Sequence, residues 1–307
     1  MTLLAEDKPV YLDHAATTPA DPAVIEAMHE CLADTGRFGN PSSVHIGGRA
    51  ARARVESARE QLGELLGTAP SNLVWTSGAT ESDNLAILGA ARLRAHRGRH
   101  LVTMRTEHKA VVDAFAALER EGFSVTWLVP RADGRLDVAE LERALRDDTQ
   151  LVSVMHVNNE TGVIQDIAAI GELCRRRGVL FHCDAAQSVG KLPLDLSALP
   201  VDLLSMTAHK FHGPQGVGAL YLAPRRDVHL SPMVFGGGQE RGLRPGTVPV
   251  HQVVGMGVAA LLARERLSSQ LARFRALNER LWQGLATIPG VLRNGGPVNA
   301  FPGILNV

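Results

Sequence analysis

The chain has 307 residues and 45% of them are hydrophobic, which is enough to bury the core of one large domain and part of a second. Its 32 Lys and Arg residues balance its 32 Asp and Glu residues, so no charge excess points to nucleic acid or to an anionic membrane. No apolar stretch approaches the roughly 20 residues of a membrane span, and residues 1–8 lack the pattern of a secretory signal.

Short apolar strands alternate with amphipathic helices along most of the chain. Apolar residues at helical spacing predict a helix that ends at Gly67, and Asp137 is expected to cap another over residues 138–145. Two more helices are predicted, one from about Thr80 and one over residues 110–120. The predicted strands are residues 73–76, 100–104, 124–128, 151–155, 179–183, 203–206 and 217–222. This alternation predicts an α/β fold with a mostly parallel sheet and helices on both faces.

The pattern becomes purely helical from about residue 251 to residue 286, after a glycine-rich loop at residues 236–246. We therefore expect a domain boundary near residues 250–260. Residues 303–307 have the pattern of a strand that is cut off midway.

Unusual polar segments follow five of the predicted strands. In an open parallel sheet, ligands bind beyond the carboxyl ends of the strands, so these segments are expected to form one pocket. They are residues 77–84, 106–109, 156–162, 184–187 and 208–210.

The first of these segments combines small residues with a predicted helix start. Free backbone N–H groups and the positive end of the helix dipole would suit a phosphate group there. The alternative is a plain helix cap by Ser77 or Thr80. The chain has neither the complete Rossmann glycine pattern nor a P-loop.

Lys210 and Asp184 stand at the ends of neighbouring predicted strands. A lysine amine can form a Schiff base with a cofactor aldehyde, and an aspartate can keep a pyridine nitrogen protonated so that the ring accepts electrons. This pair therefore indicates pyridoxal phosphate (PLP) chemistry. The alternative is a surface lysine near a structural aspartate.

His108 could stack on a flat ring or move a proton, or it could be a helix-start histidine. The histidines and cysteines show no metal-ligand spacing, so no metal is expected. Cys31, Cys174 and Cys183 form no C-x-x-C pair and no disulfide framework, which favours a cytoplasmic protein. Cys183 lies in a predicted strand, where a thiol usually packs as a small hydrophobe.

Taken together, the chain resembles the cysteine desulfurases of the IscS/NifS type, which are class V aminotransferases of PLP fold type I. The resemblance covers nearly the whole chain and is carried by residues 11–19, 39–43, 76–84, 106–109, 156–162, 184–191, 209–218 and 236–252.

The resemblance implies a role for each matching residue. Lys210 corresponds to the Schiff-base lysine, Asp184 to the partner of the pyridine nitrogen, and His108 to the ring-stacking residue that assists proton transfer. Gln187 and Asn159 correspond to residues near the ring hydroxyl, and Asn159 also to a substrate-carboxylate contact. Phosphate contacts are implied at Ala79, Thr80, Thr207, His209 and, from the second subunit of a homodimer, Thr247.

Three departures from the family pattern stand out. Thr207 and Pro245 replace residues that are commonly serine in the family. Family members also continue past residue 307 into a loop with the catalytic cysteine and an arginine that binds the substrate carboxylate. Neither segment is in this chain, so we expect a sequence truncated before its sulfur acceptor.

The resemblance implies conversion of L-cysteine to alanine, with sulfur passed as a persulfide to acceptor or iron–sulfur scaffold proteins. The expected domains are an N-terminal arm at residues 1–20, a large PLP domain at 21–255 and an incomplete small α+β domain at 256–307. The alternatives are another class V reaction, such as a selenocysteine lyase or transaminase, and a non-catalytic remnant that binds PLP or a partner.

Overall fold

The structure, a computed structural model, describes residues 9–33, 38–296 and 298–307. The expectation of no secretory signal rests on residues 1–8 and lies outside the described residues, as does the first part of the predicted arm.

A seven-stranded sheet has the order β1-β7-β6-β5-β4-β2-β3. Its strands are β1 (Leu73–Thr76), β2 (His100–Met104), β3 (Ser124–Leu128), β4 (Thr149–Ser153), β5 (Leu180–Asp184), β6 (Leu203–Thr207) and β7 (Gly218–Leu222).

The prediction of a mostly parallel sheet is confirmed. Strands β2 to β6 pair in parallel, whereas β7 runs antiparallel to both β6 and β1. The predicted strand at residues 151–155 was two residues too late, because β4 spans Thr149–Ser153. The backbone N–H of Met155 leaves the strand ladder and donates to Oε1 of Glu107 at 3.0 Å.

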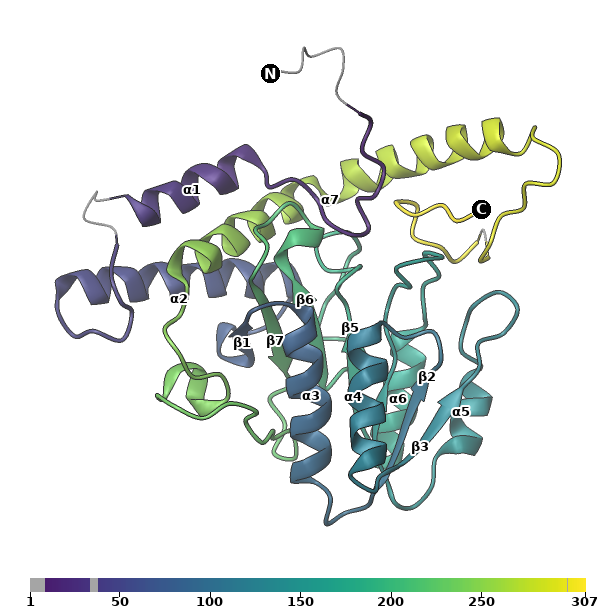
Figure 1. Cartoon of the computed structure of the whole chain (residues 1–307), viewed down its shortest axis with the longest axis horizontal. Helices are drawn as coiled ribbons and strands as arrows, with labels where there is room; N and C mark the ends of the chain where they lie inside the picture. The colour runs from purple at the N-terminus through teal and green to yellow at the C-terminus, as the bar shows by residue number, and fades with distance from the viewer. Residues whose placement is uncertain (1–8, 34–37, 297) are drawn as a thin grey trace.

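Helices cover both faces of the sheet, and α3 and α4 lie side by side on the face toward the viewer in Figure 1. The prediction that Asp137 caps a helix is confirmed, since its side chain accepts from the Ala139 N–H. Gly67 ends α2 with a φ of +65°, a left-handed conformation that glycine adopts at little cost. The helices are α1 (Pro22–Leu32), α2 (Ile46–Leu66), α3 (Ala79–Leu93), α4 (Lys109–Arg120), α5 (Val138–Ala144), α6 (Ile167–Arg177) and α7 (Val250–Leu285).

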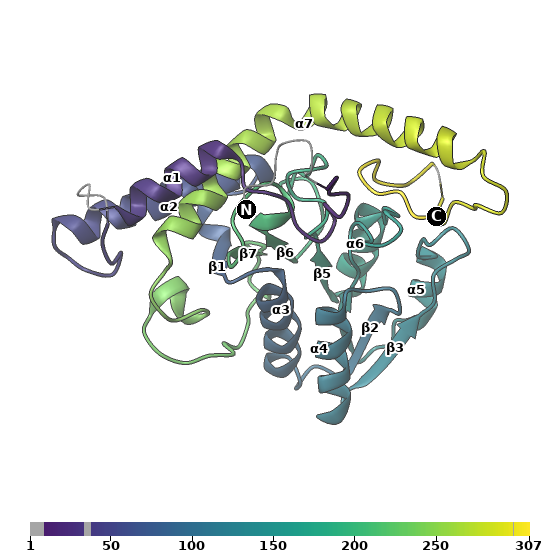
Figure 2. The same cartoon turned by 45° about the horizontal axis from the view of Figure 1, so that its top comes forward.

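Helix α7 runs along one side of the molecule and packs beside α1 and α2 (Figures 1 and 2). A Cβ atom added at Gly257 would lie 2.7 Å from the Cα of Ala58, and one at Gly255 would lie 2.9 Å from the Sδ of Met28. These two glycines therefore allow the close helix packing. Within the described ranges, no helix has both the length and the apolar character needed to cross a membrane.

The last described segment differs from the prediction. Residues 303–307 form no strand, so the prediction of a truncated strand there was wrong. Phe301 and Ile304 instead join Val157 in a small hydrophobic cluster that also contacts Phe274 of α7 and Ala15. This cluster is separate from the main core, which includes residues of α7 up to Ala263.

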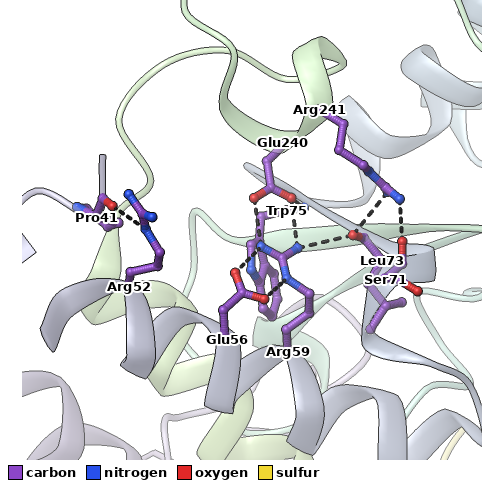
Figure 3. A network of polar contacts seen from close by, with 9 residues as sticks. All are labelled: Pro41, Arg52, Glu56, Arg59, Ser71, Leu73, Trp75, Glu240 and Arg241. Carbon is purple, nitrogen blue, oxygen red and sulfur yellow. Dashed lines mark hydrogen bonds and ion pairs between the residues drawn. The ribbon is translucent and has the colours of Figure 1, made fainter. Parts of the chain in front are cut away.

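A polar network joins the outer edge of β1 to the 3₁₀ turn Gln239–Gly242 (Figure 3). Glu240 receives two hydrogen bonds of 2.8 Å from the guanidinium of Arg59 and one of 2.8 Å from the backbone N–H of Trp75. Arg59 also donates to the Leu73 carbonyl at 3.1 Å, and Arg241 donates to the Ser71 carbonyl. The Arg59 and Glu240 side chains are only 9% and 6% exposed. This ion pair holds Glu240 and Arg241 in left-handed conformations, with φ of +46° and +60°.

Candidate active site

A cavity of about 930 Å³ lies where the carboxyl ends of β1, β2, β4, β5 and β6 meet. Residues predicted from the sequence line it from all five strand ends. They are Ala79, Thr80, His108, Asn159, Asp184, Gln187, Thr207, His209 and Lys210. Thr247 is exposed and does not line this cavity.

Lys210 ends the 3₁₀ turn Ala208–Lys210, which directly follows β6. Its Nζ donates a hydrogen bond to the Ala15 carbonyl, so the N-terminal segment contacts the lysine. Burial lowers the pKa of Lys210 below its ordinary value, while the charges of Asp184, Asp13 and Glu160 oppose this shift. A lowered pKa increases the fraction of unprotonated amine, which is the nucleophilic form.

Asp184 is the last residue of β5, and its side chain is buried. Burial raises the pKa of its carboxyl group, whereas the Ala186 N–H and the neighbouring His108 and Lys210 favour the ionised form. The Ala186 N–H donates to Oδ1 of Asp184 at 2.9 Å. The arrangement therefore presents a partly desolvated carboxyl group to the cavity.

Gln187 has a defined amide orientation. Its Oε1 accepts from Nζ of Lys191 at 2.9 Å, and its Nε2 donates to the Ala15 carbonyl at 2.8 Å. Because a backbone carbonyl can only accept, the contact with Ala15 fixes which side of the amide carries the nitrogen, and the oxygen therefore faces Lys191. Burial, assisted by the charge of Lys210, lowers the pKa of Lys191 to about 7.

His108 is the N-cap of α4, so the alternative of a helix-start histidine is correct, and the residue also lines the cavity. Its Nδ1 accepts from the Ala110 N–H at 3.1 Å. In the neutral ring the proton is therefore on Nε2, which is left free for a ligand. The ligand atoms of Asp83, His108 and Asp184 lie within 4.8 Å of one another. The expectation of no metal stays a prediction.

The start of α3 forms the other end of the cavity. Gly78 is its N-cap with no side-chain cap, so the predicted alternative of a cap by Ser77 or Thr80 was wrong. Glu81 accepts from the Ser77 N–H at 2.7 Å and pairs with Arg244 at 3.1 Å. The ion pair compensates the Glu81 charge, and the uncapped helix start leaves this end suited to an anion.

His209 and Thr207 approach the same end. The Nδ1 atom of His209 lies 3.1 Å from Oγ1 of Thr17, and Thr207 donates to the Val217 carbonyl at 3.3 Å. Burial, with the charges of Lys210 and Lys191, lowers the pKa of His209 to about 4. His209 is thus neutral near pH 7. Asn159 also lines the cavity, and its Nδ2 donates to Oε1 of Glu160 at 2.7 Å.

Sequence reasoning missed several residues of the site. Asp13, Ala15 and Thr17 line the cavity from the N-terminal segment, where their contacts depend on the fold and leave no spacing signal. Two buried acids, Asp83 and Glu107, lie within or beside polar segments that were recognised, but their burial could not be read from the pattern.

The three cysteines are free and buried. Burial raises the pKa of Cys174 to about 12 and raises that of Cys183 well above its ordinary value. The prediction that Cys183 packs as a small hydrophobe is confirmed by its place in the main core.

Comparison with known proteins shows which family this chain is similar to. The aminotransferase class-V family model matches residues 10–307. The chain is 55% identical to the cysteine desulfurase IscS of Enterobacter sp. (strain 638) and 54% identical to that of Klebsiella pneumoniae subsp. pneumoniae. Both alignments cover 97% of this chain and 74% of the relative.

Solved structures with similar folds include a NifS-like protein and SspA. A NifS-like protein superimposes with a TM-score of 0.92 at 38% identity, covering 96% of this chain and 80% of that one. SspA, solved in complex with cysteine, superimposes with a TM-score of 0.85 at 40% identity, covering 96% of this chain and 82% of that one.

Proposed function

We propose that this chain, which belongs to the class V aminotransferase family and within it to the cysteine desulfurases, binds PLP through Lys210 and releases the sulfur of L-cysteine. The observation that carries the proposal is that Lys210 and Asp184 line one cavity whose far end is an uncapped helix start. An amine, a carboxyl group and an anion site are the three partners that a pyridoxal phosphate molecule requires.

The described residues fit this cofactor. The cavity of about 930 Å³ is large enough for PLP together with an amino acid. The start of α3, with Thr207 and His209, would hold the phosphate, and His108 would lie against the ring. Gln187 would donate from its Nε2 to the ring hydroxyl, because Lys191 holds the opposite side of the amide. When bound, PLP supplies an aldehyde and a ring that withdraws electrons from the substrate.

Two side chains would transfer protons. Lys210, with its lowered pKa, takes the α proton of the amino acid and returns a proton later. His108 is placed to assist through Nε2, because its Nδ1 is used in capping α4. Asn159, which also lines the cavity, would orient the substrate carboxylate. Asp184 would keep the proton on the ring nitrogen.

The thiol that accepts the sulfur would not be one of the three cysteines of this chain. All three are buried, and a thiolate must reach the substrate sulfur within bonding distance. We infer that the sulfur passes to a thiol supplied from elsewhere and then to acceptor or iron–sulfur scaffold proteins. The three unpaired cysteines support a cytoplasmic location.

We also propose three structural units and a homodimer. The separate cluster of Phe301, Ile304 and Phe274 supports a small second domain after about residue 255, and the place of Ala15 beside it supports an N-terminal arm. Thr247 is exposed and outside the cavity of its own chain, which supports a phosphate contact to a second copy.

Borohydride trapping followed by peptide mapping tests the cofactor assignment. Purified protein incubated with PLP should absorb visible light, and reduction should fix the cofactor to the peptide that contains Lys210. Lys210→Ala should abolish the fixed cofactor, while the neighbouring control Lys191→Ala should retain it. A protein that stays colourless with added PLP, or a label on Lys191, would refute the assignment.

The reaction itself is measured as alanine released from L-cysteine in the presence of an added thiol. The same assay with selenocysteine tests the alternative substrate.

A further inference from the structure

A second carboxyl group, that of Asp83, lies within 4.8 Å of Asp184 and is shielded from solvent. Asp83 is the fifth residue of α3 and is 0% exposed. Neither of its carboxyl oxygens has a hydrogen-bond partner among the described residues. The nearest basic atom is Nε2 of His182, at 3.5 Å from Oδ1. A buried polar group with no partner is rare in proteins and calls for an explanation.

His182 does not compensate a negative charge on Asp83. Its two ring nitrogens lie 2.8 Å from Oγ of Ser153 and 2.9 Å from Oγ of Ser205. Burial lowers the pKa of His182 to about 3, so the ring is neutral at physiological pH. Glu107, the other buried acid nearby, uses Oε1 to accept from the Met155 N–H, and its Oε2 has no partner in the part of the chain that the structure describes.

The carboxyl groups of Asp83 and Asp184 compete for one negative charge. Side-chain oxygens of Asp83 and Asp184 lie within 4.8 Å of each other, and two carboxylates this close inside a protein do not both ionise readily. Asp184 has the Ala186 N–H, His108 and Lys210 to stabilise its charge. Asp83 faces Asp184, Glu107 and the neutral His182, and a ring nitrogen of His108 lies within 4.8 Å of it. The nearby Ser205 hydroxyl favours the ionised form of Asp83, but its oxygen lies 2.9 Å from Nε2 of His182 and it is not within hydrogen-bonding geometry of Asp83.

Burial, the charge of Asp184 and the nearby Glu107 together raise the pKa of Asp83 well above its ordinary value. The surroundings therefore place the negative charge on Asp184 and the proton on Asp83. Retaining the proton avoids the larger cost of an unpaired buried charge.

We propose that Asp83 is a positioning residue, held as a neutral carboxylic acid, whose O–H dipole supports the negative charge of Asp184. The role given to Asp184 rests on the proposed function, because it is the ring nitrogen of the cofactor that needs this charge. Ionisation of Asp83 would push a proton onto Asp184 and remove the anion from the cavity.

The stability of the apoprotein tests the protonation state without any cofactor. The unfolded chain ionises Asp83 above about pH 3.8, whereas the folded chain keeps the proton. The unfolded state then binds fewer protons, so folding stability falls as the pH rises through this window. Relative to Asp83→Asn, the folding equilibrium constant of the wild type should fall by up to about tenfold per pH unit above pH 4. A pH-independent ratio would overturn the proposal.

Infrared spectra of the same apoproteins provide a direct readout. A protonated buried carboxyl group gives a C=O band that a carboxylate lacks, and this band should be present near pH 7. Asp83→Asn should remove one such component. Glu107→Gln is the matched control, since it removes a different buried acid and should leave the Asp83 component in place. An unchanged band in Asp83→Asn would show that Asp83 is ionised.

Cofactor binding tests the link to Asp184. Asp83→Asn keeps a neutral donor, so its dissociation constant for PLP should stay within about threefold of the wild type. Asp83→Leu has a similar shape but no polar group and should bind PLP more than about threefold more weakly, because the charge of Asp184 then loses the support of a nearby dipole in a buried site. Equal weakening in both variants would refute the supporting role. If the wild type does not bind PLP, the proposed function fails, while the apoprotein measurements still decide the state of Asp83.

Discussion

His156 is an 8%-exposed histidine whose Nδ1 has no hydrogen-bond partner among the described residues. Burial lowers its pKa from 6.5 to about 4, so the folded protein holds it neutral where the unfolded chain would take up a proton. The stability it contributes is present above pH 6.5 and is lost as the pH falls toward 4. Compared with His156→Gln, the wild type should lose about 2 kcal/mol of unfolding free energy between pH 7.5 and 4.5. Urea titrations at both pH values measure this, and parallel losses in both proteins would contradict it.

The three thiols should react slowly in the folded protein. Cys174 and Cys183 combine full burial with a raised pKa, and Cys31 is 5% exposed and accepts a hydrogen bond from Arg54. We expect a colorimetric thiol reagent to label native protein at least about 100-fold more slowly than urea-unfolded protein. After incubation with L-cysteine and PLP, mass spectrometry should find no persulfide on these residues. A persulfide on Cys183 would show that the sulfur acceptor lies inside the chain.

The chemistry-bearing residues could be predicted because each follows a strand, and strand ends converge at one edge of a parallel sheet. Lys210 and His108 follow β6 and β2 in this way, whereas Asp184 is the last residue of β5, one residue beyond the predicted strand end. The Ala15 carbonyl could not be predicted, because its contact with Lys210 joins residues 195 positions apart. The proton on Asp83 depends on burial and neighbouring charge, which a sequence pattern does not contain.

At the scale of elements, the buried ion pair of Arg59 and Glu240 holds the 3₁₀ turn Gln239–Gly242 against α2 and β1. Glu240→Gln leaves the buried guanidinium without its main counter-charge and should lower the unfolding free energy by about 3 kcal/mol. The control Glu64→Gln disrupts an exposed pair with Arg264 and should cost less than about 1 kcal/mol. Chemical denaturation measures both variants. Equal losses would mean that the network adds no more than a surface contact.

Element types were easier to predict than element ends. The strands and helices followed from apolar periodicity and caps such as Asp137 and Gly67. The end of β4 was misplaced because Glu107, far away in sequence, takes the N–H of Met155. Residues 303–307 had the composition of a strand, but the backbone of Asn306 accepts from Asn294, and Ile304 packs into the small cluster instead.

For the whole molecule, the proposed homodimer predicts an oligomeric state that depends on protein concentration. Sedimentation should detect a dimer. Thr247→Ala should weaken PLP binding but leave the dimer intact, because a threonine hydroxyl supplies only one hydrogen bond to a charged phosphate. The loss should be about tenfold. Thr287→Ala, at an exposed helix end in the same chain, is the control and should bind PLP as the wild type does. A monomer that binds PLP tightly would contradict the shared site.

The contacts of Arg59, Glu240 and Arg241 with β1 also bear on self-association. A terminal strand offers its backbone groups as a template on which a foreign strand can add, and this is a common start of aggregation. Here the Leu73 carbonyl and the Trp75 N–H, which β7 does not use, are already bonded to side chains. At the β1 edge of the sheet, guanidinium and carboxylate groups thus occupy backbone groups that a further strand would otherwise bind. Loss of Glu240 should therefore shorten the lag time of fibril growth as well as lower stability.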